Sequence, residues 1–145
     1  MCWTSKEIPK AKIAEKNIKT FKVMYRGLED EELFSYFFYK LYSIGKITSK
    51  IILSYEKFDS SYYIHAGYHS YDINIKWKYY YNSEEDAYMV KIGNVEEYYI
   101  EPFSDIFHTL CIVECTIPKS SKYYLNEKGE YVSEQIIVDK ILEEY

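Results

Sequence analysis

The sequence lacks an apolar stretch of the roughly 20 residues that a membrane-spanning helix needs. Its first six residues, Met1-Cys-Trp-Thr-Ser-Lys6, also lack the apolar core of a secretory leader. Cysteine is scarce, and its number, three, is odd, which does not suit a disulfide-based scaffold. These absences predict a cytoplasmic protein without membrane contact.

Glycine and proline are also scarce, with five and three residues, whereas tyrosine occurs 19 times. Aromatic side chains fit the pleated, half-buried surface of a strand, so the composition favours a β-rich protein. The 145 residues, 48% of them hydrophobic, are enough to bury a core. Because repeats and low-complexity tracts are absent as well, we expect one domain spanning residues 1–145.

A concentrated basic segment is missing too. The net charge is −5 and the lysines are scattered along the chain. Binding to duplex DNA depends on a basic footprint that neutralises phosphates, so we expect no duplex DNA partner.

The clearest predicted strand covers residues 111–117. Cys111, Val113, Cys115 and Ile117 alternate with their neighbours, which predicts a strand with one buried face, and Pro118 ends it. A turn containing Asn126 and Gly129 should then lead to a second apolar run at residues 136–138. On a straight strand Cys111 and Cys115 lie about 13 Å apart, too far for a disulfide.

Other segments predict a mixture of strands and short helices. We expect a strand at residues 18–25 with Phe21, Val23 and Tyr25 inward, followed by a turn at Arg26-Gly27. Residues 33–44 fit either a helix or a strand, and their aromatic content favours a strand turning at Gly45 into a hairpin partner at residues 46–55. The remaining expected elements are a helix within residues 1–17, a helix at 82–90 capped by Asn82 or Ser83, and a strand or loop at 95–100.

The predicted fold class is therefore α+β: a β-rich single domain with a mainly antiparallel sheet and few short helices.

The histidines and cysteines give little support for catalysis. His65 and His69 have a metal-ligand spacing only if both lie on a helix, and Gly67 between them favours strand and turn. We therefore expect no metal and no cofactor. A cysteine nucleophile using His108 lacks a third, orienting group. Buried cysteine usually serves as a small apolar side chain.

Arg26 and the tyrosines are the candidates for binding. Arg26 follows an apolar strand and could hold a phosphate or carboxylate with two parallel hydrogen bonds, although an exposed arginine at a strand end is the more common situation. Tyrosine clusters can stack on a planar ligand or pair one inward ring with one outward ring on a strand. The clusters are Tyr62-Tyr63, Tyr79-Tyr80-Tyr81, Tyr98-Tyr99 and Tyr123-Tyr124.

Three segments, residues 66–72, 114–124 and 126–134, resemble a family of small proteins from gut bacteria and their phages. The resemblance covers about the C-terminal half and the Met1-Cys-Trp start, and it implies no particular activity.

The order of the segments is also similar, more remotely, to the ADP-ribosyltransferases. That family has an arginine after its first strand, where this chain has Arg26, and a Gly-aromatic-Ser-Thr-Ser strand, where it has residues 67–71. An Ile-Pro-Lys-Gly turn corresponds to residues 117–120, and a Glu-x-Glu strand to residues 134–136. The second glutamate, the catalytic one, is replaced by Ile136, so the resemblance implies a nucleotide-shaped cleft more than an active transferase.

These observations predict a non-catalytic protein that binds a small-molecule nucleotide, such as a cyclic or ADP-ribose-type signal, or a host protein. The phage resemblance suggests sequestration of that signal or blocking of a host defence component. The alternatives are an NAD-dependent transferase or NAD-cleaving enzyme and a protein–protein interaction module, and a homo-oligomer stays open. The residues expected at the binding site are Arg26, His69, Ser70, Tyr71, Tyr124 and Glu134.

Overall fold

The computed structural model describes residues 3–27, 33–35, 41–100 and 107–145, and the side chains of these residues except 107 and 108. This part of the chain is all β, with strands arranged in antiparallel sheets and no helix. The predicted α+β class is therefore wrong, although the β-rich antiparallel part of the prediction is correct. The strands are β1 (Trp3–Ser5), β2 (Lys12–Ile13), β3 (Ile18–Gly27), β4 (Leu33–Ser35), β5 (Leu41–Tyr42), β6 (Glu56–Phe58), β7 (Ser61–Ile64), β8 (Tyr68–Asp72), β9 (Trp77–Asn82), β10 (Ala87–Ile92), β11 (Glu96–Ile100), β12 (Phe107–Ile117), β13 (Lys122–Leu125), β14 (Glu130–Ser133) and β15 (Ile137–Glu144).

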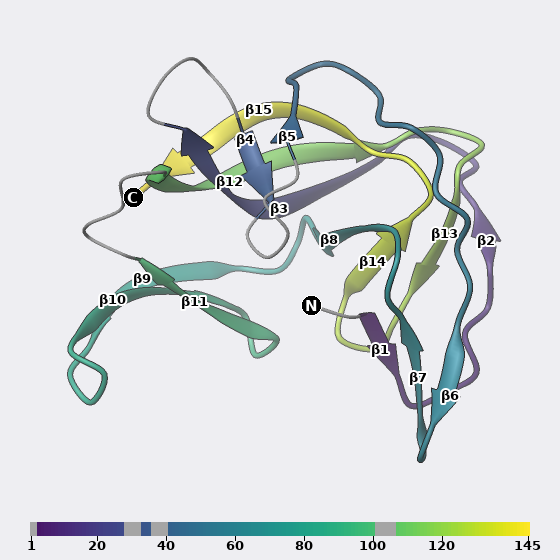
Figure 1. The fold of residues 1–145 in the computed structure, drawn as a ribbon, viewed down its shortest axis with the longest axis horizontal. Helices are drawn as coiled ribbons and strands as arrows, with labels where there is room; N and C mark the ends of the chain where they lie inside the picture. Colours follow the sequence, from purple (N-terminus) through teal and green to yellow (C-terminus); the bar gives the residue numbers. More distant parts are fainter. Residues whose placement is uncertain (1–2, 28–32, 36–40, 101–106) are drawn as a thin grey trace.

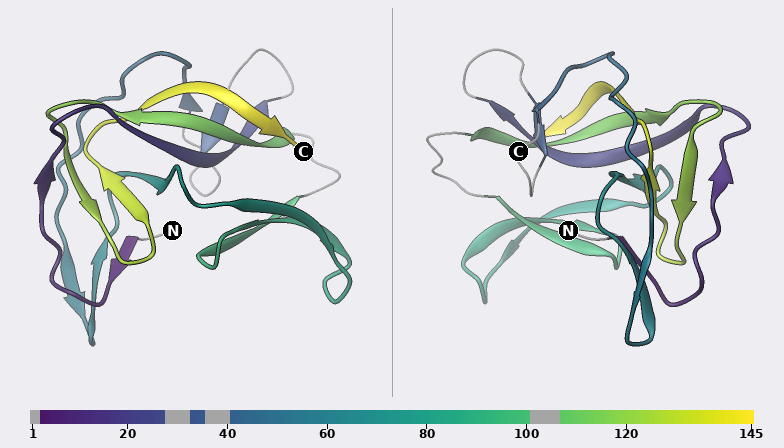
Figure 2. Two further views of the ribbon diagram at one scale, coloured as in Figure 1. Left: turned by 180° about the vertical axis from the view of Figure 1, so that it is seen from behind. Right: turned by 45° about the vertical axis from the view of Figure 1, so that its right-hand side comes forward.

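Most strands belong to one nine-stranded sheet, whose main path runs β15-β12-β3-β8-β14-β13-β2 (Figure 1). Beside β8, β3 also pairs with β4, which pairs with β5. Two three-stranded sheets, β1-β7-β6 and β11-β10-β9, accompany it. Figure 2 shows β9, β10 and β11 as a separate layer beside β3, β12 and β15.

The pair β3 and β12 forms the centre of the large sheet, and both of its faces are covered. The register joins Met24 to Cys111 and Val23 to Ile112. Met24, Cys111 and Ile112 are fully buried and Val23 nearly so. Both predicted strands are confirmed, but the expectation of a single buried face for residues 111–117 is wrong. The predicted turn at Arg26-Gly27 is also wrong, because β3 continues through Gly27.

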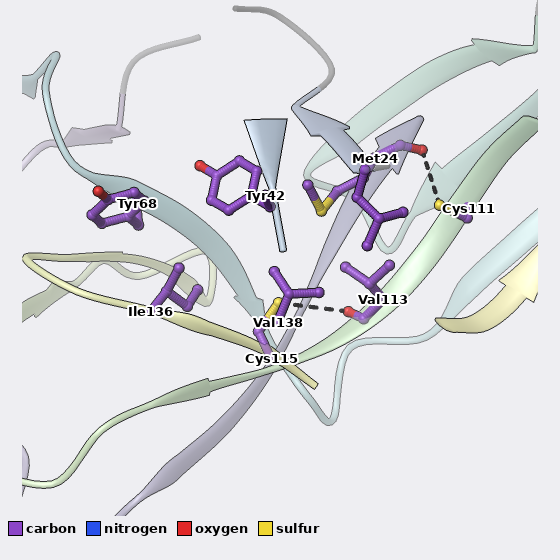
Figure 3. Close-up of a cluster of buried hydrophobic side chains, with 9 residues drawn as sticks. Met24, Tyr42, Tyr68, Cys111, Val113, Cys115, Ile136 and Val138 are labelled. Carbon is purple, nitrogen blue, oxygen red and sulfur yellow. Dashed lines mark hydrogen bonds between the residues drawn. The ribbon is translucent and has the colours of Figure 1, made fainter. Parts of the chain in front are cut away.

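One face of this pair carries a core that we call the sulfur core. Met24, Cys111, Cys115 and Val138 contribute to it (Figure 3), and Leu33 and Tyr42 cover it from β4 and β5. The opposite face carries the inter-sheet core, which fills the space between the large sheet and β9-β10-β11. Its members include Phe21, Tyr71, Val90, Tyr98 and Ile112.

Residues 45–51 follow the start of β15 without forming a strand of their own. Backbone amides of Gly45, Thr48 and Ile51 donate to the carbonyls of Val138, Ile136 and Glu134, at 2.8, 3.0 and 3.0 Å. The predicted hairpin partner at 46–55 is wrong, because this segment pairs with a distant strand and not with its predecessor. The strand preference for residues 33–44 is confirmed at 33–35 and 41–42, and residues 36–40 lie outside the described part.

Both predicted helices are wrong. In the described part of residues 1–17, Trp3 lies on β1 and packs in a third core with Leu53, Ile64, Tyr124 and Val132. Tertiary burial of the large Trp3 ring outweighs the weak helical preference of the residues that follow it in the sequence.

Residues 82–90 form a turn and the strand β10 instead of a helix. The Asn82 side chain does accept from the amides of Glu84 and Glu85, at 3.0 and 3.3 Å. It therefore stabilises a hairpin turn with the same hydrogen bonds that would cap a helix. The strand reading of residues 95–100 is confirmed by β11, and the turn at Asn126 and Gly129 is confirmed as the connection of β13 and β14.

Strand β15 contains two extra residues relative to β12. Its register shifts between the partners of Ile112 and Val113, and again between those of Glu114 and Cys115. The residues skipped by the pairing are Leu142 and Asp139, so β15 carries two bulges. The Asp139 carboxylate accepts from the Thr116 hydroxyl at 2.6 Å and pairs with Lys19 at 3.1 Å.

No helix in the described residues is long and apolar enough to cross a membrane.

Candidate functional site

Arg26, the predicted anion-binding residue, already has an anionic partner within the protein. Its Nη1 atom lies 3.1 Å from Oε1 of Glu144 on β15, and both side chains are about one-third exposed. Strand pairing brings the two charges together: Arg26 on β3 pairs with Thr109 of β12. Two residues further along β12, Cys111 pairs with Glu144 of β15. A ligand phosphate would have to displace this carboxylate.

His69 lies on β8, opposite Val132 of β14; the residue is half-buried, and its Nε2 atom is fully buried. Burial, together with the nearby Lys22 ammonium, lowers the pKa of His69 to about 3. Its Nε2 atom has no hydrogen-bond partner among the described residues. The ring is therefore neutral at physiological pH and does not attract an anion.

The structure does not bring Arg26 and His69 together. Phe21 pairs with Tyr71, so these two side chains share one face of the sheet. Side chains alternate along a strand, which places His69, two residues from Tyr71, on the Phe21 face. Arg26 is five residues from Phe21 and therefore belongs to the opposite face.

The other predicted site residues are buried in the fold or hydrogen-bonded within it. Ser70 is 3% exposed, and its hydroxyl has no partner among the described residues. The hydroxyls of Tyr71 and Tyr98 bond to each other inside the inter-sheet core. Tyr124 is buried with its ring centroid 6.0 Å from that of Trp3. Glu134 accepts from the backbone amide of Lys122 at 2.9 Å.

The two cysteines that the structure describes do not form a catalytic site. Cys111 and Cys115 are free and buried, and desolvation raises the pKa of each thiol to about 12. Such thiols are inert as nucleophiles. The side chain of His108 lies outside the described part, and the described histidines, cysteines, aspartates and glutamates form no group of three that could hold a metal ion.

The most prominent exposed feature is a row of aromatic rings, which we call the tyrosine surface: Tyr79 and Tyr81 of β9, Tyr88 of β10 and Tyr145. Tyr79, Tyr81 and Tyr88 are 47%, 49% and 51% exposed. The Tyr79 ring stacks on Tyr88 and on Tyr145, with centroids 5.5 and 5.0 Å apart and planes only 4° and 7° from parallel. Tyr81 contacts Tyr88 edge to face at 5.1 Å.

Strand pairing explains why these rings share one face. Tyr81 lies opposite Tyr88, and Tyr79 lies opposite Val90. Because Val90 belongs to the inter-sheet core, the tyrosine surface is the outward continuation of that core. The amide of Tyr145 donates to the Leu110 carbonyl at 2.8 Å, which fixes the last ring beside Tyr79.

Carboxylates border the tyrosine surface. The turn after β9 contains Glu84, Glu85 and Asp86, which we call the acidic turn, and all three are exposed. The Tyr81 hydroxyl donates to Asp86. At the other end of the row, hydrogen bonds from Tyr145 and then Trp77 lower the pKa of Glu143, which keeps this carboxylate charged.

The stacking limits what the tyrosine surface can bind. Tyr79 already stacks on two tyrosine rings of the protein itself, Tyr88 and Tyr145, so a nucleobase that stacked on Tyr79 would compete with them. Tyrosine combines an apolar ring with a polar hydroxyl, a combination common at protein interfaces. Cross-strand tyrosine pairs also stabilise a hairpin, so the row contributes to the fold as well.

Sequence reasoning found part of this surface. The cluster Tyr79-Tyr80-Tyr81 was a candidate, and the expected alternation is present, since Tyr79 and Tyr81 share a face that Tyr80 does not. Tyr88 was missed because its segment was assigned to a helix. The period-two pattern Trp77, Tyr79, Tyr81 is the signal that points to an aromatic strand face.

No family model, curated protein or solved structure matches this chain. The resemblances to the phage-associated family and to the ADP-ribosyltransferases stay predictions.

Proposed function

We propose that this protein is a non-catalytic protein-binding domain that contacts its partner through the tyrosine surface. The observation that carries the proposal is the row of Tyr79, Tyr81 and Tyr88, three adjacent rings that are each about half exposed. Tyrosine supplies a large contact area with few rotatable bonds, so it loses little conformational entropy on binding. Stacking on Tyr145 orders the row further before a partner arrives.

The same structure gives less support to the other two functions. Nucleotide sequestration relied on Arg26 together with His69. These two residues lie on opposite faces of the sheet, and Arg26 is already paired with Glu144. An NAD-dependent transferase would need a carboxylate where the chain has Ile136, which is completely buried. The buried thiols of Cys111 and Cys115 offer no nucleophile in its place.

The proposed setting is the cytoplasm, where reduced thiols such as those of Cys111 and Cys115 persist. If the resemblance to phage-associated proteins reflects kinship, a host protein is one class of partner.

Site-specific photo-crosslinking in cells tests the proposal. The photoreactive amino acid p-benzoylphenylalanine would replace Tyr81, or Phe58 as the matched control. Phe58 is an exposed aromatic residue, 67% accessible, on β6 of another sheet. We expect a discrete crosslinked protein band from position 81 and none from position 58.

Equal crosslinking at both positions, or none at position 81, contradicts the proposal. Mass spectrometry of small molecules released from the denatured protein provides a separate check: a stoichiometric nucleotide would favour sequestration instead.

A further inference from the structure

Strand pairing adds a distant lysine to three neighbouring ones at one edge of the large sheet. Strand β2 pairs with β13 through Ile13–Lys122 and Lys12–Tyr123, and Ala14 exchanges backbone hydrogen bonds with Ser120 and Ser121. This pairing brings residues 10–16 beside residues 119–122. We call the group Lys10, Lys12, Lys16 and Lys119 the lysine edge.

The lysine edge is both charged and partly apolar. All four lysines are exposed, and Ile13 among them is 59% exposed. Glu15 is the one carboxylate among the described residues 10–16 and 119–122. The edge is also a terminus of the nine-stranded sheet, because β2 is the last strand of its path.

The lysine edge and the acidic turn lie at opposite ends of the molecule. Figure 1 shows β2 and β13 at one end of the longest axis and the turn between β9 and β10 at the other. The reversed view in Figure 2 shows the same separation. The protein therefore carries the lysine edge at one end and the acidic turn, next to the tyrosine surface, at the other.

We propose that the partner of the tyrosine surface is a second copy of this chain, which docks its lysine edge there. This inference rests on the proposed function and names the occupant. The lysine ammonium groups would pair with Glu84 and Glu85, while Ile13 and the lysine methylenes would cover the edges of Tyr81 and Tyr88. The two surfaces are complementary in charge and in apolar character.

The contact joins two different surfaces, so each copy keeps one free end. Such a heterologous contact produces a ring when the rotation closes and an open chain of copies when it does not. Growth would proceed along the longest axis, since the two surfaces terminate it.

Analytical ultracentrifugation of the full chain tests this inference. We expect wild-type association that increases with protein concentration and weakens in about 1 M NaCl, where the screening length falls to about 3 Å. The basic-edge variant, Lys10→Glu/Lys12→Glu, should associate at least about tenfold more weakly, because attractive pairs become repulsive. The acidic-turn variant, Glu84→Lys/Glu85→Lys, should behave in the same way.

Mixing the two variants provides the decisive measurement. In the basic-edge variant the lysine edge and the acidic turn are both negative. In the acidic-turn variant both are positive. An equimolar mixture should therefore restore association, with the two variants alternating. The control Lys46→Glu/Lys50→Glu makes the same charge change at two exposed lysines outside the lysine edge and should associate like the wild type.

Three results would overturn the inference: a monomeric wild type at every concentration and salt level, unchanged association of either variant, or a mixture that stays monomeric. A monomeric wild type together with a foreign protein crosslinked from position 81 would leave the proposed function standing. A wild type that neither self-associates nor gives any crosslink from position 81 would refute both this inference and the proposed function. Circular dichroism of each variant establishes that its exposed substitutions leave the fold intact.

Discussion

Replacement of Gly67 by alanine is expected to destabilise the protein by about 2–6 kcal/mol, the sum of a backbone cost and a packing cost. Gly67 connects β7 to β8 with φ +132°, a conformation that side chains strongly disfavour. A Cβ atom there would lie 2.5 Å from Cγ2 of Val132 and 2.7 Å from Cδ2 of Leu53. Backbone strain costs about 1–3 kcal/mol, and displacement of buried neighbours about 1–3 kcal/mol more.

The matched control for this substitution is Gly45→Ala. Gly45 has φ +79°, but nothing lies within 4 Å of its added Cβ. We therefore expect only the strain of a left-handed conformation, about 1–2 kcal/mol. The difference between the two variants therefore contains the packing cost at Gly67 together with any difference in backbone strain, and the Val132→Ala background separates the two.

Equilibrium unfolding in urea, followed by circular dichroism, measures both variants. With a urea dependence of about 2 kcal/mol per molar, Gly67→Ala should lower the unfolding midpoint by about 1–3 M. Val132→Ala removes the nearest clashing atom, so in that background the additional cost of Gly67→Ala should decrease. Equal losses from the Gly67 and Gly45 variants, or no relief in the Val132→Ala background, would refute the reasoning.

Three further predictions follow from buried polar groups. Cys111 and Cys115 should resist alkylation by iodoacetamide at about pH 8 and react only in urea, because burial raises their thiol pKa values to about 12. Peptide mass spectrometry reads the labelling, and a labelled Cys111 or Cys115 in the folded protein would contradict this prediction. For His69, the folded pKa of about 3 lies below the unfolded value of about 6.5, so protonation favours the unfolded state, and stability should be full above about pH 6.5 and decrease toward pH 3. Urea midpoints at several pH values should show a weaker acid dependence in His69→Asn than in the wild type, and identical profiles would count against the burial of a neutral ring. Trp3→Phe removes the Nε1 donor that lies 2.7 Å from the Glu130 carbonyl and should cost about 1–3 kcal/mol in urea unfolding, whereas an unchanged midpoint would show that this carbonyl finds another donor.

The central strands could be predicted because their side chains alternate in character. Residues 18–25 and 111–117 became β3 and β12, as period-two patterns indicate. Burial of the second face also had a signal, since Leu110, Ile112 and Val113 form a nearly continuous apolar run, which is typical of strands covered on both sides.

The helices could not be excluded from local sequence because one local interaction serves two structures. Asn82 followed by carboxylates is a good helix start, and the same side-chain oxygen closes the turn between β9 and β10. Only the pairing of Tyr81 with Tyr88 and of Trp77 with Ile92 distinguishes the hairpin. Such pairing depends on residues that approach one another through folding.

The candidate site shows the same limit. A ligand site formed by Arg26 and His69 required both side chains on one face, and the register of Phe21 with Tyr71 decides that question. Sequence does not give this register. Likewise, Lys119 joins Lys10, Lys12 and Lys16 in the lysine edge only through the pairing of β2 with β13, which joins residues more than 100 positions apart in the chain.

The two supernumerary residues of β15, Asp139 and Leu142, have a consequence for colloidal behaviour. A border strand of a wide sheet exposes amide and carbonyl groups that can recruit any extended polypeptide and start amyloid-like stacking. Each bulge changes the spacing of these groups, so a straight incoming strand cannot pair with all of them. Residues 45–51 already cover the start of the β15 edge. Lateral growth is thereby discouraged on this flank, so the β15 border of the largest sheet is a poor seed for aggregation.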